Sequence, residues 1–421
     1  MEHHCRKQVA VIGAGAAGMM AAICAAESGA QVVLIEKNSR PGRKIGITGK
    51  GRCNVTNADE LTDLFKNIVT NPRFLYSALY GFTNQDVMER FEQAGVPLKI
   101  ERGNRVFPVS DSARDIIDGL TGMVKQQKVK LYTGVTVKSI EKHEDRWKVL
   151  TNQQEFEADA VIIATGGRSY SKTGSTGDGY AWAKELGHGI TPTRPGLIPL
   201  TSSTGWVPTL QGISLKNVSI HITEGSGKSV HEGFGEMLFT HYGVSGPLIL
   251  SASSLLQRYL VQKKKGWAEA ELTLHIDLKP ALSLQQLDQR LLRDFTEYRG
   301  RTMEHAMKDL LPERLIGVIL EESGVDPDSR AGDLTKADRQ KIATVLKDLK
   351  CSITGTRSME EAIITMGGVD TKQLDPKTME SKLHCGLYFA GEIIDVDALT
   401  GGYNLQIAFS TGAAAGRAAA Q

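Results

Sequence analysis

Three glycines near the N-terminus are spaced as a phosphate-binding turn requires. Gly13, Gly15 and Gly18 directly follow the apolar run at residues 9–12. The first glycine allows a tight turn, the second lets the backbone approach a pyrophosphate, and the third lets a helix pack closely on a strand. The positive end of that helix favours an anion. The spacing therefore predicts a dinucleotide site lined by Gly13, Ala14, Gly15, Ala16, Ala17 and Gly18.

A carboxylate follows where such a site needs one. Residues 31–35 form a second β-rich run that ends in Glu36, which lies 36 − 13 = 23 positions after Gly13. An acid at this place can accept hydrogen bonds from ribose hydroxyls. The strand, glycine turn, helix and second strand together predict one βαβ unit. A secretory signal is the alternative for this basic and apolar start, but its removal would destroy the motif, so we expect the N-terminus to be retained.

The segment at residues 37–57 is rich in glycine and positive charge, and it can wrap a phosphorylated ligand. It buries little apolar area of its own, so a flexible surface loop is the alternative interpretation. The candidate ligand-binding residues in this segment are Lys37, Arg43, Lys44, Gly49, Gly51, Arg52, Cys53 and Asn54.

The string Gly-Arg-Cys-Asn-Val-Thr-Asn at residues 51–57, together with the glycine fingerprint and Glu36, resembles the HI0933-like flavoprotein family. Similarity extends to residues 164–167 and to the last 35 residues of the chain. The resemblance implies FAD as cofactor and an NAD(P)/FAD-dependent oxidoreductase activity. This family usually has Gly-Gly-Lys where the chain has Gly-Arg-Lys at residues 42–44. The positive charge is kept, so we expect the same cofactor.

The resemblance also assigns later segments to the cofactor, because the family shares the glutathione reductase-like architecture. A strand containing Val137 would pass the adenine, although an ordinary core valine is the alternative. The turn at Thr165 and Gly166 would return to the cofactor. Gly391 and Glu392 would bring a carboxylate to the ribityl or pyrophosphate hydroxyls.

The final helix, starting near residue 404, would point its N-terminus at the pyrimidine edge of the flavin and stabilise negative charge there. A capped terminal helix without cofactor contact is the alternative. The candidates in this segment are Gly402, Asn404, Leu405 and Gln406.

The same patterns predict the domain organisation. Residues 1–193 and 362–421 would form a discontinuous FAD-binding domain, and residues 194–361 an inserted domain that begins at a proline-rich boundary. The insert would be β-rich, a small barrel or sheet, at about 194–280 and 351–361, and helical at about 283–350. The fold class is therefore α/β: a Rossmann-like FAD-binding domain built from both chain ends, with an inserted β-barrel-like plus helical domain.

Composition narrows the class of protein. The 421 residues exceed what one hydrophobic core usually serves. The formal net charge of +2 disfavours nucleic acid as a partner, and the sequence contains no uninterrupted apolar run long enough for a membrane span. Five widely spaced cysteines without a C-x-x-C pair suit a reducing cytoplasm. They argue against a disulfide framework, a cysteine zinc site and a dithiol redox centre.

These observations lead to an expected function. Only one dinucleotide fingerprint is present, so NADH or NADPH would dock transiently as the donor, or another donor would be used. We expect an FAD-dependent reductase that passes electrons from NAD(P)H through FAD to an unsaturated small-molecule acceptor. The alternatives are an FAD-dependent RNA-modifying enzyme and a non-catalytic flavin-binding sensor. No catalytic acid or base can be chosen from residue spacing alone.

Overall fold

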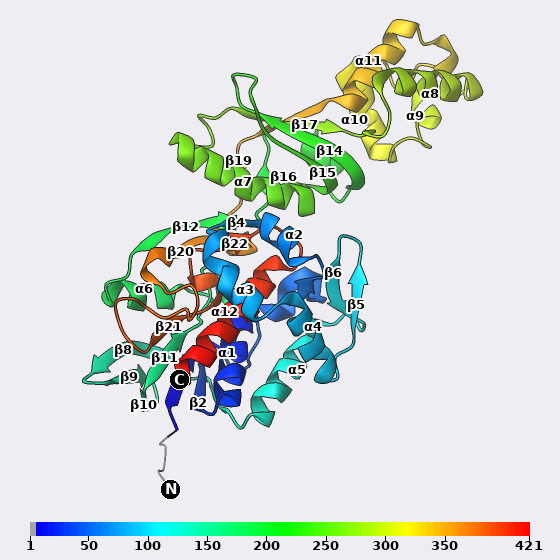
Figure 1. Ribbon diagram of the computed structural model, residues 1–421. Coiled ribbons are helices and arrows are strands. Elements are labelled where there is room, and N and C mark those ends of the chain that lie inside the picture. The colour runs from blue at the N-terminus through cyan, green and yellow to red at the C-terminus, as the bar shows by residue number, and fades with distance from the viewer. Residues whose placement is uncertain (1–5) are drawn as a thin grey trace. The chain divides into compact units, whose positions relative to one another are not determined.

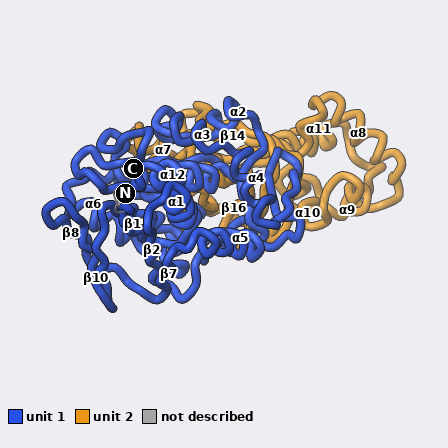
Figure 2. The backbone as a smooth tube through the Cα atoms, turned by 60° about the horizontal axis from the view of Figure 1, so that its bottom comes forward, with its two compact units in different colours: residues 1–195, 359–421 blue, residues 196–358 orange. Residues whose placement is uncertain are grey.

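The computed structural model describes residues 6–421, which form two compact units (Figures 1 and 2). Unit 1 combines residues up to 195 with residues 359–421, and unit 2 spans residues 196–358. Each unit has its own cluster of buried apolar side chains. Among the described residues, no helix is both long enough and apolar enough to cross a membrane.

Unit 1 is organised around a parallel five-stranded sheet with the order β21-β11-β1-β2-β7. The strands are short and rich in buried apolar residues, as expected for a parallel sheet covered on both faces. The edge strand β21 comes from the C-terminal part of the chain, which confirms that both ends build the domain. The strands are β1 (Gln8–Ile12), β2 (Gln31–Glu36), β7 (Lys130–Thr133), β11 (Ala160–Ile163) and β21 (Leu387–Phe389).

The first and last helices of the chain pack against each other beside this sheet, as Figure 1 shows for α1 (Ala16–Glu27) in blue and α12 (Tyr403–Ala419) in red. A Cβ added at Gly412 would lie 2.4 Å from the Ala17 carbonyl oxygen, and one added at Gly416 would lie 2.2 Å from that of Ala21. Glycine is therefore required for this approach. The other helices of unit 1 are α2 (Leu61–Lys66), α3 (Tyr76–Gly81), α4 (Asn84–Gln93), α5 (Ala113–Gln126) and α6 (Asp178–Glu185).

Smaller sheets complete unit 1. A three-stranded antiparallel sheet has the order β10-β9-β8, a second has the order β3-β6-β5, and two further pairs are β12-β20 and β22-β4. Their bounds are β3 (Thr56–Asn57), β4 (Ile68–Thr70), β5 (Leu98–Glu101), β6 (Arg105–Pro108), β8 (Val137–His143), β9 (Arg146–Thr151), β10 (Glu155–Ala158), β12 (Ile190–Gly196), β20 (Ile364–Val369) and β22 (Asp397–Ala398).

Unit 2 contains a seven-stranded antiparallel sheet with the order β18-β17-β14-β15-β16-β13-β19. Alternate residues of its long strands are buried, as the period of a one-sided sheet requires. The strands are β13 (Leu200–Thr201), β14 (Ser214–Thr223), β15 (Ser229–Thr240), β16 (Gly243–Ser245), β17 (Leu272–Asp277), β18 (Leu349–Ile353) and β19 (Gly355–Thr356).

The helices of unit 2 follow the predicted helical stretch, with one addition. The helix α7 (Pro247–Lys263) lies inside the region that the sequence pattern assigned to β-structure. It begins with Pro247, which is favoured in the first helical turn. Two other helices of this unit begin with capping boxes, in which Ser283 and Thr335 are the N-cap residues. The helices after α7 are α8 (Leu284–Glu297), α9 (Met303–Ala306), α10 (Glu313–Ser323) and α11 (Lys336–Lys347).

Candidate cofactor site

The glycine turn between β1 and α1 has the geometry of a phosphate-binding turn. Gly13 has φ of +103°, and a Cβ there would lie 2.5 Å from the Ala164 carbonyl oxygen. A Cβ at Gly18 would lie 1.8 Å from the carbonyl oxygen of Gly13. At Gly15, in contrast, an added Cβ would meet no described atom within 4 Å. Two glycines therefore allow close packing, and the middle one faces open space where a pyrophosphate could approach the N-terminus of α1.

The carboxylate of Glu36 is buried at the end of β2 and faces this turn. Its Oε2 accepts the backbone N–H of Ala14 at 2.8 Å. Its Oε1 accepts the backbone N–H of Asn38 at 2.8 Å and the side-chain Nδ2 of the same residue at 2.6 Å. Glu36 thus fixes the glycine turn, while a carboxylate oxygen can accept further hydrogen bonds from a ribose.

The segment after β2 folds into a tight irregular loop around η1 (Ile45–Gly51). Positive φ angles occur at Gly49, Lys50, Gly51 and Cys53, and the two that are not glycine are costly backbone conformations. Successive turns can form concave surfaces of backbone N–H groups that suit anions. In this loop the N–H groups of Arg52 and Cys53 already donate to the carbonyl oxygens of Gly49 and Thr48. Burial raises the pKa of the Cys53 thiol to about 12, so this cysteine is not a reactive thiolate.

The predicted cationic side chains of the segment at residues 37–57 contact different partners. Lys37 pairs with Asp178 at 2.7 Å, and Arg43 donates to the side chain of Asn38 at 2.9 Å. Arg52 lies over the ring of Phe107 at 4.2 Å. The Arg52 guanidinium also pairs with the carboxylates of Glu101 and Asp111. These two carboxylates hold Arg52 in place by charge-assisted hydrogen bonds.

Two buried polar side-chain atoms of predicted site residues in unit 1 have no hydrogen-bond partner within the described chain. Within residues 6–421, Oδ1 of Asn54 and Oγ1 of Thr165 are buried without a hydrogen-bond partner. Asn54 adjoins Gly49, whereas Oγ1 of Thr165 lies against Gly179 of α6. Buried polar groups almost always have partners. Asn54 therefore fits a polar cofactor that would donate a hydrogen bond to its Oδ1.

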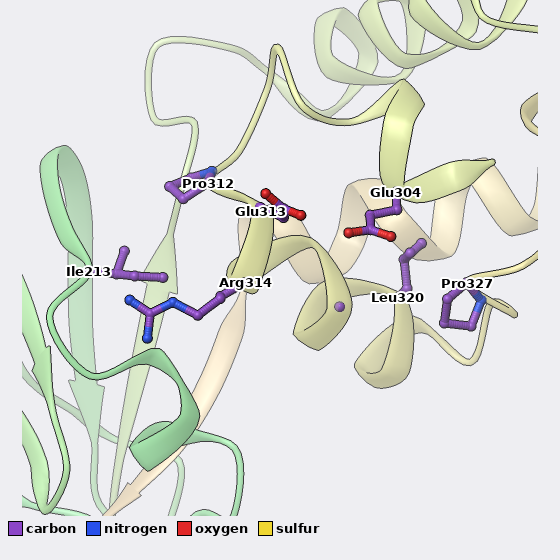
Figure 3. A pocket seen from close by; sticks show the side chains of 8 residues that line it. Ile213, Glu304, Pro312, Glu313, Arg314, Leu320 and Pro327 are labelled. Atoms are coloured by element: carbon purple, nitrogen blue, oxygen red, sulfur yellow. The ribbon is translucent and has the colours of Figure 1, made fainter. Parts of the chain in front are cut away.

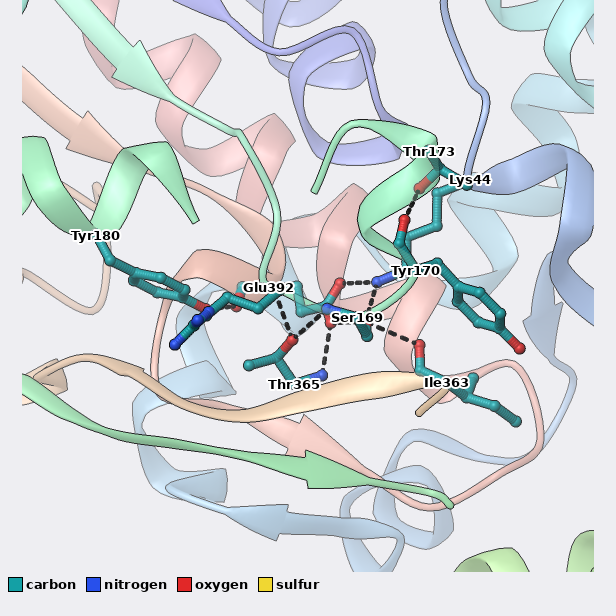
Figure 4. A network of polar contacts seen from close by, with 9 residues as sticks. Lys44, Ser169, Tyr170, Thr173, Tyr180, Ile363, Thr365 and Glu392 are labelled. Atoms are coloured by element: carbon teal, nitrogen blue, oxygen red, sulfur yellow. Dashed lines mark hydrogen bonds and ion pairs between the residues drawn. The ribbon is translucent and has the colours of Figure 1, made fainter. Parts of the chain in front are cut away.

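Glu392 is the centre of a polar network that joins distant parts of unit 1 (Figure 4). Its Oε2 accepts from Nζ of Lys44 at 2.5 Å. Its Oε1 accepts the backbone N–H of Thr365 at 2.7 Å and the hydroxyl of Ser169 at 3.0 Å. Lys44 also donates to Ser169 at 2.6 Å. The structure thus brings two predicted site residues, Lys44 and Glu392, into direct contact.

Two members of this network were not found from the sequence. Ser169 and Thr365 carry no local motif, and they meet Glu392 only through the tertiary fold. Next to them, a Cβ at Gly167 would lie 2.3 Å from Oγ1 of Thr365. Gly166, which was predicted, has φ of +72° and needs glycine for that reason. Gly391 likewise has φ of +78° and adjoins Ala17 of α1.

The N-terminus of α12 is held by contacts with β3 and β22. Gly402 precedes the helix with φ of +102°, and a Cβ there would lie 2.3 Å from the Thr56 carbonyl oxygen. Oδ1 of Asn404 accepts the backbone N–H of Ala398 at 3.0 Å, and Nδ2 of Asn404 donates to the carbonyl oxygen of Ala398 at 2.8 Å. Gln406 is buried and accepts the hydroxyl of Thr56 at 2.6 Å. Both amides therefore have structural partners, and Leu405 packs against the core of unit 1. Contact of these residues with a cofactor stays a prediction.

Val137 lies at the start of β8, where it is buried and pairs with Thr151. This is compatible with a core position and leaves its contact with adenine a prediction.

A hollow of about 630 Å³ lies in unit 2, beside α10 (Figure 3). Glu304, Glu313 and Arg314 are among its lining residues. Two carboxylates at this hollow would repel a pyrophosphate, and nothing there resembles the glycine turn of unit 1. The predicted cofactor residues all belong to unit 1.

Comparisons with known proteins identify the family of the chain. A family model described as the HI0933-like protein Rossmann domain matches residues 7–418. The chain is 33% identical over 417 residues to the 3-dehydro-bile acid delta(4,6)-reductase of Clostridium scindens, covering 98% of this chain and 99% of that protein. It is also 33% identical over 401 residues to the ribosomal RNA dihydrouridine synthase of Escherichia coli, covering 95% of each.

A solved structure shares the fold. The 3-ketosteroid delta1-dehydrogenase from Sterolibacterium denitrificans is 14% identical, with a TM-score of 0.50 and coverage of 98% of this chain and 99% of that one. Family match, full-length relatives and the glycine turn agree, so the chain belongs to the HI0933-like family and is an FAD-dependent oxidoreductase.

Proposed function

We propose that this protein reduces a carbon–carbon double bond conjugated to a carbonyl group, with electrons that pass from NAD(P)H through bound FAD. The observation that carries the proposal is a chemistry common to two relatives, each 33% identical to the chain. One is named for reduction of the delta(4,6) bonds of a 3-dehydro bile acid. The other is named for making dihydrouridine, which is uridine with its ring double bond reduced. In both substrates that double bond is conjugated to a carbonyl.

The residues of unit 1 have distinct roles in this proposal. The glycine turn and the first turn of α1 would hold the pyrophosphate, and Glu36 would hold the ribose. Lys44 and Glu392 would position the middle of the cofactor through the network that they share with Ser169. FAD, when bound, supplies hydride transfer to the acceptor. The first turn of α12 consists of uncharged residues, so its positive dipole end would favour negative charge on the reduced ring.

The donor would dock transiently. The chain offers one dinucleotide fingerprint, which the cofactor would occupy, so NADH or NADPH would reach the flavin without a Rossmann domain of its own. The net reaction would oxidise NAD(P)H to NAD(P)⁺ and reduce the double bond, with the hydride ending on one carbon and a proton from solvent on the other.

A small molecule is the acceptor class that we favour, because the net charge of +2 supplies no broad field for a phosphate backbone. Ribosomal RNA is the second candidate, and one surface feature favours it. Phe65, Tyr76 and Tyr80 form a cluster of three rings, with centroids 4.4 to 6.3 Å apart and planes inclined to one another by 19° to 32°. Tyr76 and Tyr80 are 48% and 56% exposed. Exposed rings of this kind can stack with unpaired bases.

The test begins with anaerobic titration of the FAD-loaded protein with NADH and with NADPH, followed by the visible absorption of the flavin. We expect one donor to bleach it rapidly, and dithionite serves as the control that the flavin can be reduced. The reduced protein is then mixed anaerobically with a 3-oxo-4,6-diene steroid or with unmodified ribosomal RNA. Reoxidation by the steroid alone supports the favoured acceptor class, and reoxidation by RNA alone supports the second. A flavin that dithionite reduces but neither nicotinamide does would refute the proposed donor.

A further inference from the structure

Unit 2 carries a row of polar side chains across four adjacent strands of its sheet. Strand pairing places Glu232 of β15 opposite His221 of β14, His221 opposite His275 of β17, and His275 opposite Lys350 of β18. The flanking residues in these strands, such as Ile222 and Leu274, are fully buried on the other face. The row therefore lies on the outer face of the sheet, where solutes can reach it.

Two histidines and a carboxylate converge within this row. The imidazole rings of His221 and His275 are stacked, with centroids 4.1 Å apart and planes inclined by 17°. Oδ1 of Asp348, which lies between α11 and β18, is 2.7 Å from Nδ1 of His275. One ligand atom from each of the three residues lies within 4.8 Å of the others. No other histidine, cysteine or acidic cluster of this kind was found in residues 6–421.

The donor set suits a divalent transition metal. Imidazole nitrogen and carboxylate oxygen are ordinary Zn²⁺ ligands, with bonds of about 2.0 to 2.2 Å. Donors within 4.8 Å can close around such an ion by rotation of side chains, without a change in strand pairing.

We propose that His221, His275 and Asp348 form a binding site for Zn²⁺ or a similar divalent transition metal, with water completing the coordination. The ion would join β14, β17 and the start of β18, so its role would be to stabilise unit 2. Lys350, whose Nζ lies 3.2 Å from Oδ2 of Asp348, would move away on binding. The proposal concerns unit 2 alone and does not depend on the proposed reaction.

The competing explanation is a hydrogen-bonded chain without metal. Nδ1 of His275 can donate to Asp348, and its Nε2 lies 3.1 Å from the hydroxyl of Thr223. Asp348→Asn separates the two explanations, because an amide oxygen still accepts from Nδ1 but is a much poorer metal ligand than a carboxylate.

The experiment uses the full-length, FAD-loaded protein and competition with a chromophoric zinc chelator. The N-terminal sequence His3-His4-Cys5 can itself bind zinc, so every protein carries His3→Ala, His4→Ala and Cys5→Ser. On this background we compare His221→Ala, Asp348→Asn and, as a matched control, His305→Ala, which removes an exposed histidine of α9 outside the cluster.

We expect one zinc ion per chain in the background protein and in the His305→Ala control. Removing a ligand should weaken zinc binding by about tenfold or more, because losing even a residue that only hydrogen-bonds to a ligand weakens metal binding by about that factor. Zinc should also raise the thermal unfolding midpoint of the background protein and of the control, but not of the two ligand variants. Absence of stoichiometric zinc in the background protein, or equal affinity in all the variants, would overturn the proposal.

Discussion

At the scale of single residues, Glu36 is the carboxylate on which the predicted ribose contact depends. Its carboxylate fixes the glycine turn through Ala14 and the following loop through Asn38. In the proposed function it also binds the ribose of FAD. The pattern of strand, glycines and acid predicted the position of this carboxylate, but its backbone partners became visible only in the folded chain.

Glu36→Ala should weaken FAD binding by roughly 1.5 to 3 kcal/mol, the usual worth of hydrogen bonds to a charged group. The dissociation constant can be measured by flavin fluorescence on the apoprotein. Glu36→Gln is the matched variant, because it keeps an acceptor of the same shape without the charge, and it should lose less affinity. If the alanine variant binds FAD as tightly as the unaltered protein, the assignment of the βαβ unit to FAD is wrong.

At the scale of elements, the contact between α1 and α12 ties the two ends of the chain together. Gly416→Ala would place a Cβ about 2.2 Å from the Ala21 carbonyl oxygen, which cannot move without distorting α1. We expect a loss of about 1 to 3 kcal/mol in the free energy of unfolding, typical of overpacking. Denaturant unfolding would measure this loss. Ala418→Ser adds one heavy atom at a less buried position of the same helix and should change stability little.

His188, which follows α6, should make unit 1 less stable at acidic pH. His188 is buried, its Nε2 lies 2.8 Å from the Ser381 hydroxyl, and that hydroxyl already accepts two backbone N–H groups. The hydroxyl therefore donates to a neutral ring. Burial lowers the pKa of His188, and the nearby His384 lowers it further.

A histidine whose folded-state pKa is depressed takes up its proton more readily in the unfolded chain. Above a pH of about 6.5 both states are neutral, and below it only the unfolded state gains a proton until the folded pKa is reached. Stability should therefore fall as the pH drops through this window. Thermal unfolding at several pH values measures this fall in stability. The fall should be smaller in His188→Gln than in the unaltered protein, and it should be unchanged in His143→Gln, which alters an exposed histidine. Equal falls in all three proteins would exclude His188 as the cause.

Elements with a clear local signal were predicted from the sequence, and those without one were not. The βαβ unit follows from glycine spacing and apolar periodicity. The helix α7 was missed, because its apolar residues lie among serines and glutamine in a region dominated by strands. Ser169 and Thr365 were missed because their role depends on contacts across about 200 residues of sequence. Such contacts leave no periodic pattern in the chain.

At the scale of the whole molecule, the chain has two separate hydrophobic cores, one in each unit. Residues that would hold FAD belong to unit 1, so the cofactor should stabilise that unit directly. Ligand binding adds stability by mass action, about 2.7 kcal/mol when free FAD is at one hundred times its dissociation constant. The two cores give a reason to expect unfolding in two steps.

Calorimetry should therefore show two transitions, of which FAD raises only one. Two variants identify them: Gly416→Ala should lower the FAD-sensitive transition, and Leu274→Ala, which empties a fully buried position in the core of unit 2, should lower the other. A buried leucine-to-alanine change costs about 2 to 5 kcal/mol, enough to move a transition clearly. A single transition that both variants and FAD shift together would show that the two units unfold as one cooperative structure.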